Sequence, residues 1–172
     1  SMGDSILAKV ENFVDVKSLK ISGTLNSDDI ATIQSRLTNL RELDMTDVNM
    51  TALPNEMFYQ RKALEIVKLP ANLISIGEYA FYQCYGIKNI DFPSTLTTIY
   101  NYAFYDCDNI QQVILPEGVT SLGYRSFHSC DNNKYVKLPS TLKSVSEDCF
   151  RYNLSLQQVD FSEGLTHIYR SA

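Results

Sequence analysis

The sequence predicts an α/β solenoid, a stack of similar coils in which each coil covers the apolar side of its neighbour. Three observations lead to this prediction. Phenylalanines recur at a fixed step of 23 residues, a short strand motif occurs seven times, and one early repeat carries helix signals. The phenylalanines are Phe58, Phe81, Phe104, Phe127 and Phe150. A period of this size is typical of repeat architectures, because one such unit cannot bury its apolar side alone.

The composition fits one folded domain and narrows the class of partner. Of the 172 residues, 44% are hydrophobic and 20% are charged, and the net charge is −5. A surface that binds nucleic acid needs clustered Lys and Arg, so nucleic acid is not an expected partner. No apolar run approaches the roughly 20 residues that a membrane span requires, so we expect no transmembrane segment in this chain.

The chain divides into an N-terminal cap segment, residues 1–15, and a repeat domain of about seven coils, residues 16–172. In the cap, Asp4 can begin a helix over residues 4–15 with apolar residues at helical spacing, which would cover the first coil. At the other end, residues 168–172 repeat the approach to a sixth phenylalanine. We therefore expect the natural protein to continue and the repeat domain to be truncated here.

The strand motif places apolar residues at alternate positions with one outward residue between them. Its copies begin at Val16, Leu40, Leu64, Ile87, Ile110, Asn133 and Leu156. The alternate residues share one side of a strand, and we expect them to face the core. These pairs are Leu19/Ile21, Leu43/Met45, Val67/Leu69, Ile90/Phe92, Val113/Leu115, Val136/Leu138 and Val159/Phe161. Stacking then predicts one parallel sheet, with strands about 4.8 Å apart.

The early repeats differ from the later ones in the segment after the strand. Ser27 can cap a helix that opens with Asp28 and Asp29 and carries Arg36 near its end, which complements the helix dipole. The sequence therefore predicts an α-helix over residues 28–38. The next repeat is a hybrid that leads into the tight-turn coils.

From Leu64 onward the coils share one pattern. Successive strands end at Pro70, Pro93, Pro116 and Pro139. Two inner apolar positions then allow a second short strand, and we expect the ladder phenylalanine to lie on a single helical turn. Cys84, Cys107 and Cys130 each come three residues after a phenylalanine. Stacking would permit a disulfide between them, but small thiols are also typical of buried positions, and we expect free, buried cysteines.

The runs LPANLISIGEYAFYQCYGIKNIDFP and LPEGVTSLGYRSFHSC resemble the BspA-like leucine-rich repeats of bacterial surface proteins. In that family an Ala-Phe pair, a downstream Cys or Asn and a strand ending in Leu-Pro recur at the same 23-residue step. The resemblance covers residues 53–172 and implies a leucine-rich-repeat fold, which is a right-handed superhelix with its parallel sheet on the concave side. Arg61, in place of the Cys or Asn, and Asn133, at the start of a strand, depart from the pattern. We expect looser packing around Asn133.

No catalytic motif accompanies the repeats. His128 and His167 are the only histidines, and neither has a Cys or carboxylate at metal-ligand spacing. The sequence contains no Gly-rich phosphate loop, nucleophile elbow or HExxH run. We therefore expect no enzyme activity, cofactor or metal, and we interpret His128 as a surface member of a tyrosine ladder.

The outward side of the predicted sheet is the candidate binding face. Its central outward residues alternate in charge along much of the stack, which can simply hold neighbouring strands in register. Other outward residues add apolar area, and exposed apolar area can mark a protein interface. The candidate residues are Asp44, Ile66, Lys68, Asn89, Asp91, Gln112, Ile114, Tyr135, Lys137, Gln158 and Asp160.

Several of the 11 tyrosines define a second candidate face at the opposite edge of the coils. Tyr59, Tyr82 and Tyr105 come directly after their ladder phenylalanines, and Tyr79 and Tyr102 precede theirs by two residues. Such rows are commonly structural, although exposed tyrosines can also stack on sugars or anchor proteins.

These patterns predict a non-catalytic binding or adhesion module that contacts another protein. The family resemblance implies an extracellular or cell-surface location. Two alternatives stay open at this point, a carbohydrate-binding surface built on the tyrosines and a structural spacer that presents another domain.

Overall fold

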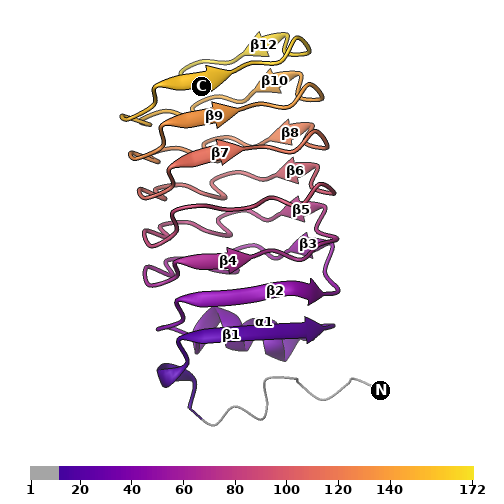
Figure 1. Cartoon of the computed structure of the whole chain (residues 1–172), viewed down its shortest axis with the longest axis vertical. Helices are drawn as coiled ribbons and strands as arrows, with labels where there is room; N and C mark the ends of the chain where they lie inside the picture. The colour runs from indigo at the N-terminus through magenta and orange to yellow at the C-terminus, as the bar shows by residue number, and fades with distance from the viewer. Residues whose placement is uncertain (1–11) are drawn as a thin grey trace.

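The computed structural model describes residues 12–172, which form one elongated stack of coils (Figure 1). The predicted solenoid class is confirmed. The expected cap helix, residues 4–15, lies largely outside the described residues. Within residues 12–15, Phe13–Asp15 form a 3-10 helix, η1, and Phe13 is buried under the first coil.

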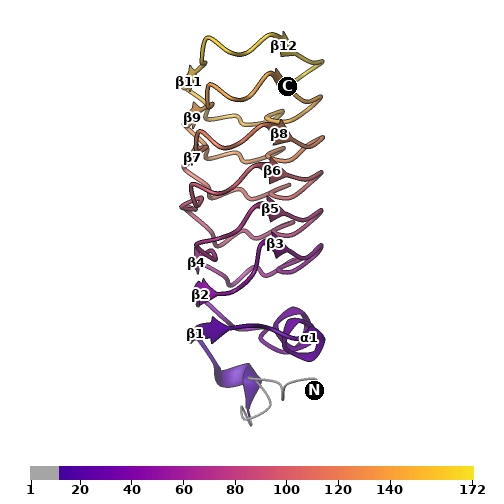
Figure 2. The same cartoon turned by 90° about the vertical axis from the view of Figure 1, so that its right-hand side faces the viewer.

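Two rows of strands run along the stack on different sides of the coils (Figure 2). The front row consists of β1 (Ser18–Gly23), β2 (Glu42–Val48), β4 (Ile66–Lys68), β7 (Gln112–Ile114), β9 (Tyr135–Lys137) and β11 (Gln158–Asp160). The back row consists of β3 (Ala52–Leu53), β5 (Ser75–Ile76), β6 (Thr98–Ile99), β8 (Ser121–Leu122), β10 (Ser144–Val145) and β12 (His167–Ile168). Every strand pair is parallel, and the register step equals one repeat except after Lys20, where the pairing of β1 with β2 shifts by one residue.

The predicted inner positions of the front strands face the core, except that Phe161 in the last coil is exposed. In the front row, Leu43 pairs with Val67, and Val113 pairs with Val136, and all four side chains are buried. The second short strand that the sequence allows is present as the back row. Because each coil supplies apolar residues from both rows, the core is continuous along the stack.

The front row is interrupted, which corrects the expectation of one continuous sheet. It consists of two three-stranded sheets, β1-β2-β4 and β11-β9-β7, and residues 89–91 between them form no strand (Figure 1). The inner residues of this coil are Ile90 and Phe92, where the adjacent coils carry a smaller Val and Leu. Both are only half-buried. We attribute the interruption to overpacking, because inner side chains that are too large shift the backbone.

The helix α1 spans Ser27–Ser35, so it is shorter than the predicted 28–38. Its N-cap is Asn26 and not Ser27. The Asn26 side chain accepts hydrogen bonds from the backbone N–H groups of Asp28 and Asp29, while the Asp29 carboxylate accepts from the Asn26 N–H. This capping box starts the helix one residue earlier than the cap that the sequence suggested. Within the described part of the chain, α1 is the only α-helix.

The segments around the ladder phenylalanines, which we call the turn edge, are not helical turns, and this expectation was wrong. Each phenylalanine lies between two residues with left-handed backbone, as Phe81 lies between Tyr79, with φ 55°, and Gln83, with φ 57°. The Phe81 N–H donates to the Ala103 carbonyl at 2.7 Å, in the next coil. Alternate N–H groups of the turn therefore bond to the neighbouring coil, and these bonds offset the cost of left-handed non-glycine residues.

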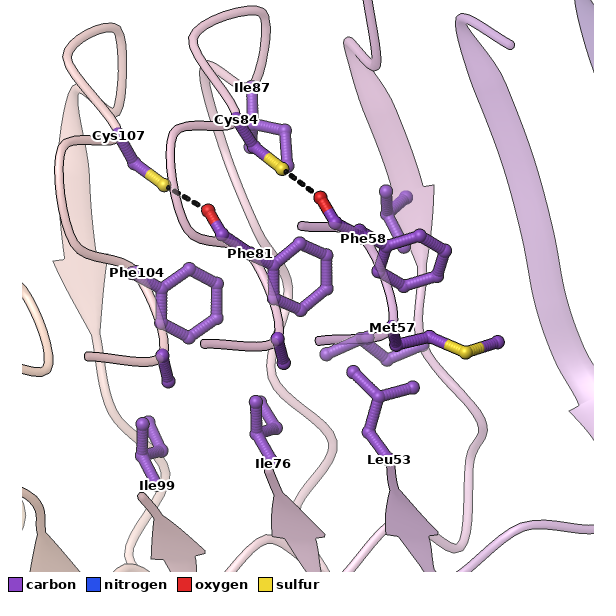
Figure 3. Packing of buried hydrophobic residues seen from close by; sticks show 14 of the residues in the cluster. Leu53, Met57, Phe58, Ile76, Phe81, Cys84, Ile87, Ile99, Phe104 and Cys107 are labelled. Carbon is purple, nitrogen blue, oxygen red and sulfur yellow. Dashed lines mark hydrogen bonds between the residues drawn. The ribbon is translucent and has the colours of Figure 1, made fainter. Parts of the chain in front are cut away.

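The phenylalanine ladder fills the centre of the coils (Figure 3). Phe104 stacks on Phe81 at 4.8 Å and on Phe127 at 5.0 Å between ring centroids. Behind the rings, the Cys84 thiol donates to the Phe58 carbonyl and the Cys107 thiol to the Phe81 carbonyl, each at 3.0 Å. All four cysteines are buried and free. The predicted cysteine ladder is thus a row of hydrogen-bond donors to the preceding coil.

Arg61 occupies the cysteine position in the coil of Phe58 and makes the same kind of bond with a longer side chain. Its guanidinium donates to the carbonyls of Ile33 and Gln34, near the C-terminal end of α1. A large donor fits because the preceding coil holds a helix in place of a tight turn. The coil is complete, since Phe58 is buried.

Candidate functional site

The eleven candidate residues all belong to the front row or to its interruption. Register places Asp44 beside Lys68 on β2 and β4. Farther along, it joins Gln112, Tyr135 and Gln158 in one row and Ile114, Lys137 and Asp160 in a second row. Asn89 and Asp91 lie in the interrupted coil between these two groups and are exposed. The structure therefore brings the candidates onto one face, which we call the front face.

At the N-terminal end of the front face, the charged groups are paired with each other. The Asp44 carboxylate accepts from the Thr46 N–H at 3.0 Å and pairs with the Lys68 ammonium at 3.1 Å. These contacts, the Thr46 bonds foremost, lower the pKa of Asp44 to about 2. Lys20 pairs with Asp47 at 3.0 Å and not with the adjacent Asp44, because the register shifts after Lys20. The predicted alternation of charge between neighbouring strands therefore does not give a Lys20–Asp44 ion pair.

At the C-terminal end of the front face, polar groups are also joined. The Tyr135 hydroxyl donates to Asp160 Oδ2 at 2.5 Å, and the Gln158 amide donates to Asp160 Oδ1 at 2.8 Å. The Tyr135 bond raises the pKa of Tyr135 and lowers the pKa of Asp160. Lys137 is exposed beside them.

The middle of the front face contains a hollow of about 240 Å³ next to the interrupted strand. This central hollow is lined by Asn89, Ile90, Asp91, Phe92, Gln112, Ile114 and Pro116. Four of these residues were predicted as candidates, and Ile90, Phe92 and Pro116 were not. The signal that could have found Ile90 and Phe92 is their size, because they replace Val and Leu at inner positions. A second hollow of about 270 Å³, lined by residues that include Thr46, Lys68, Asp91 and Phe92, lies on the other side of the same coil.

The tyrosine rows at the turn edge stack against each other. Tyr59, Tyr82, Tyr105 and His128 form a row with ring centroids 5.0, 5.1 and 4.7 Å apart and ring planes within 10°. His128 is buried, not a surface member as expected, and this burial lowers its pKa. Stacking on a sugar needs an open ring face, and this row covers its inner ring faces with its own members. The rows are therefore a poor carbohydrate platform.

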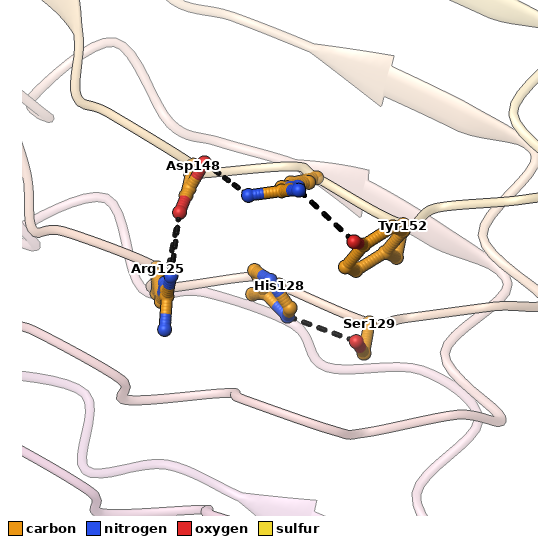
Figure 4. A network of polar contacts seen from close by, with 6 residues as sticks. Arg125, His128, Ser129, Asp148 and Tyr152 are labelled. Carbon is orange, nitrogen blue, oxygen red and sulfur yellow. Dashed lines mark hydrogen bonds and ion pairs between the residues drawn. The ribbon is translucent and has the colours of Figure 1, made fainter. Parts of the chain in front are cut away.

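A polar network joins the coils of Phe127 and Phe150 at the turn edge (Figure 4). The Asp148 carboxylate is buried and pairs with Arg125 at 2.8 Å and with Arg151 at 3.4 Å. His128 Nδ1 lies 2.8 Å from the hydroxyl of Ser129. The Asp148 oxygens are thus engaged by arginines and do not orient the imidazole, so these residues do not form a nucleophilic triad. The ion pair between Arg125 and Asp148 instead links two adjacent coils.

The described part of the chain, residues 12–172, offers no cluster of metal-ligating side chains. No three His, Cys, Asp or Glu side chains lie together there in a way that could hold an ion. In the same range no helix is both long and apolar enough to cross a membrane.

A stack of coils with parallel strand rows and a buried phenylalanine ladder is the architecture of leucine-rich-repeat proteins. A family model, described as the BspA type leucine rich repeat region, matches residues 51–172 in 6 copies. The chain belongs to this family. The match includes the coil of Phe58, where Arg61 departs from the pattern. No curated protein sequence matches the chain.

Solved structures share the fold. The leucine-rich-repeat protein TpLRR of T. pallidum is 21% identical with a TM-score of 0.74, and covers 89% of this chain. A leucine-rich-repeat protein from Bacteroides ovatus is 22% identical with a TM-score of 0.64, over 88% of the chain. The pneumococcal vaccine antigen PcpA is 14% identical with a TM-score of 0.56, also over 88%. The chain spans 67% of the first structure and 47% and 44% of the other two.

Proposed function

We propose that this chain is a non-catalytic interaction module whose front face binds another protein. Membership in the BspA-type family suggests a protein-interaction or cell-surface repeat module. The observation that carries the proposal is the exposure of Ile66, at 48%, and Ile114, at 44%, on front strands that adjoin hollows. Apolar side chains on a sheet face that would otherwise be polar are typical of a protein interface.

The proposal includes an adhesive role outside the cell or at its surface. Its support is the resemblance of the repeats to those of bacterial surface proteins. The net charge of −5 favours a partner with a complementary basic surface over an acidic one.

The two alternatives have less support. Carbohydrate binding through the tyrosines would require open ring faces, which the stacking at the turn edge largely removes. A purely structural spacer needs no binding face, so it would leave the exposed Ile66 and Ile114 without a role.

Selection of peptides from a random library displayed on phage tests the proposal with a defined probe. The variant Ile66→Ser/Ile114→Ser/Tyr135→Ser removes the apolar part of the front face. A matched control, Ile74→Ser/Ile168→Ser/Tyr100→Ser, removes two Ile and one Tyr from exposed positions outside the front face. Circular dichroism and thermal unfolding of both variants establish that the fold is retained.

We expect selected peptides to bind the control as they bind the wild type and to bind the front-face variant about tenfold more weakly or worse. If the peptides bound both variants equally, or lost binding only to the control, the binding site would lie outside the front face. Failure to select any peptide that depends on the front face would favour the spacer.

A further inference from the structure

The central hollow differs from the two ends of the front face in that its acidic and amide side chains have no partners within residues 12–172. Among residues 12–172, Asn89, Asp91 and Gln112 make no side-chain hydrogen bond, and Asp91 makes no ion pair. Lys68 lines the second hollow together with Asp91, but its ammonium group pairs with Asp44 at 3.1 Å. The Asp91 carboxylate is therefore left for a group from outside.

The ends of the same face show the contrast. Asp44 accepts hydrogen bonds from its own neighbours, and Asp160 accepts from Tyr135 and Gln158. A partner that bound there would have to compete with these internal bonds, whereas in the middle it would only displace water. Affinity should therefore concentrate at the central hollow.

The chemistry of the lining defines the ligand. A carboxylate bonds most strongly to a guanidinium or ammonium group. Side-chain amides such as those of Asn89 and Gln112 offer both donors and acceptors, which match the N–H and C=O groups of a peptide backbone. Ile114, Phe92 and Pro116 supply apolar surface beside them.

We infer that the central hollow binds an extended segment of a partner protein in which a Lys or Arg lies next to an apolar residue. The basic side chain bonds to Asp91, the amides of Asn89 and Gln112 hold the backbone, and the apolar side chain covers Ile114. This inference rests on the proposed function and specifies which part of the front face binds the partner most strongly.

The size of Ile90 and Phe92 links the site to the fold. The adjacent coils carry Val67 with Leu69 and Val113 with Leu115 at these positions, and those coils form regular strands. Phe92 is held edge-on against Phe104, with centroids 5.7 Å apart. The larger residues thus keep this coil out of the sheet and leave a hollow on each side of it.

Three variants test the inference on peptides selected with the wild-type protein. Asp91→Asn removes the anchoring charge without changing the size of the side chain. Glu147→Gln removes one negative charge from an exposed position at the turn edge and is the matched control. Ile90→Val/Phe92→Leu gives the coil the inner residues of its neighbours and should restore the strand.

We expect selected peptides to carry a basic residue next to an apolar one and to bind Asp91→Asn about tenfold more weakly, the loss for one charge-assisted bond. They should bind Glu147→Gln within about twofold of the wild type, and Ile90→Val/Phe92→Leu should lose comparable affinity while folding normally. Replacing the basic residue of the peptide by Gln should weaken wild-type binding as much as Asp91→Asn does.

Peptides that depend on Ile66 and Ile114 but lack a basic residue, or that bind Asp91→Asn unchanged, would overturn this inference and leave the proposed function standing. Peptides that do not depend on the front face at all would overturn both.

Discussion

The Asn133 side chain donates from Nδ2 to Oδ1 of Asn153 at 2.8 Å, although both residues replace the types that other coils carry. Asn133 is fully buried where neighbouring coils have Ile or Leu, and Asn153 stands at the position of the ladder cysteines. Asn153 also donates to the carbonyls of Phe127 and Phe150, each at 2.8 Å. The two amide side chains therefore satisfy each other, except that Asn133 Oδ1 has no partner in the described structure.

This relationship predicts strong coupling between the two positions. Asn133→Ile alone leaves Asn153 Oδ1 without its donor, and Asn153→Cys alone leaves the Asn133 amide buried without a partner. Each should lower the free energy of unfolding by about 1–3 kcal/mol, while the double variant restores the regular repeat and should be close to the wild type. Urea unfolding of the wild type, the two single variants and the double variant completes a double-mutant cycle. If the losses of the two single variants added up in the double variant, the two positions would not be coupled.

The central phenylalanine should stabilise the stack more than the last one. Phe104 is fully buried between two parallel rings, whereas Phe150 is half-buried and stacks on one ring at 5.5 Å. Phe104→Ala should cost about 3–5 kcal/mol of unfolding free energy, and Phe150→Ala about half as much. Chemical denaturation measures both losses. Equal losses of unfolding free energy for the two variants would contradict the expectation that a ring stacked on both sides stabilises the protein more than a ring stacked on one side.

The cysteines should be unreactive until the protein unfolds. Burial raises the pKa of the Cys84 and Cys149 thiols to about 12, so almost no thiolate is present at neutral pH. Labelling with a thiol reagent at pH 7.5 should proceed at the rate of unfolding and reach four labels per chain in denaturant without reductant. Fast labelling of the folded protein would contradict their burial, and fewer than four labels would reveal a disulfide.

The ionisation of Asp108 should make the stability of the protein depend on pH. Burial, and then the carboxylates of Asp106 and Asp131, raise the pKa of Asp108 to about 6. The folded state therefore favours the protonated acid, so the destabilisation is absent below the ordinary pKa of about 4 and complete above pH 6. Asp108→Asn should raise the unfolding free energy by about 1 kcal/mol at pH 7, because solvent reduces the effect, and by nothing near pH 3.5. Parallel pH profiles for the two proteins would contradict this.

Much of the architecture could be predicted because its determinants repeat. The alternation of Val113 and Leu115 along a strand, and the fixed step between Phe81 and Phe104, specify which side chains face the core. The left-handed residues of the turn edge were missed because they are ordinary residues such as Tyr79. Their backbone is imposed by hydrogen bonds to the next coil, and no local sequence signal marks it.

The candidate face was predictable as a set of outward positions, but its centre was not. Ile90 and Phe92 match the apolar pattern as well as Val and Leu do, so the pattern alone predicts a regular strand. The structure shows that the sheet is interrupted beside Asp91, which we attribute to the size of Ile90 and Phe92. Lys20 lies opposite Asp44 in the strand register, but its ammonium group pairs with Asp47, which follows the register shift.

The most direct test of the front face as the interaction surface is amide hydrogen exchange of the protein with and without a selected peptide. Binding at the central hollow should slow exchange in residues 88–92 and 111–116 and leave the turn edge, for example residues 79–83, unchanged. Protection confined to the turn edge, with no change at 88–92, would contradict the account.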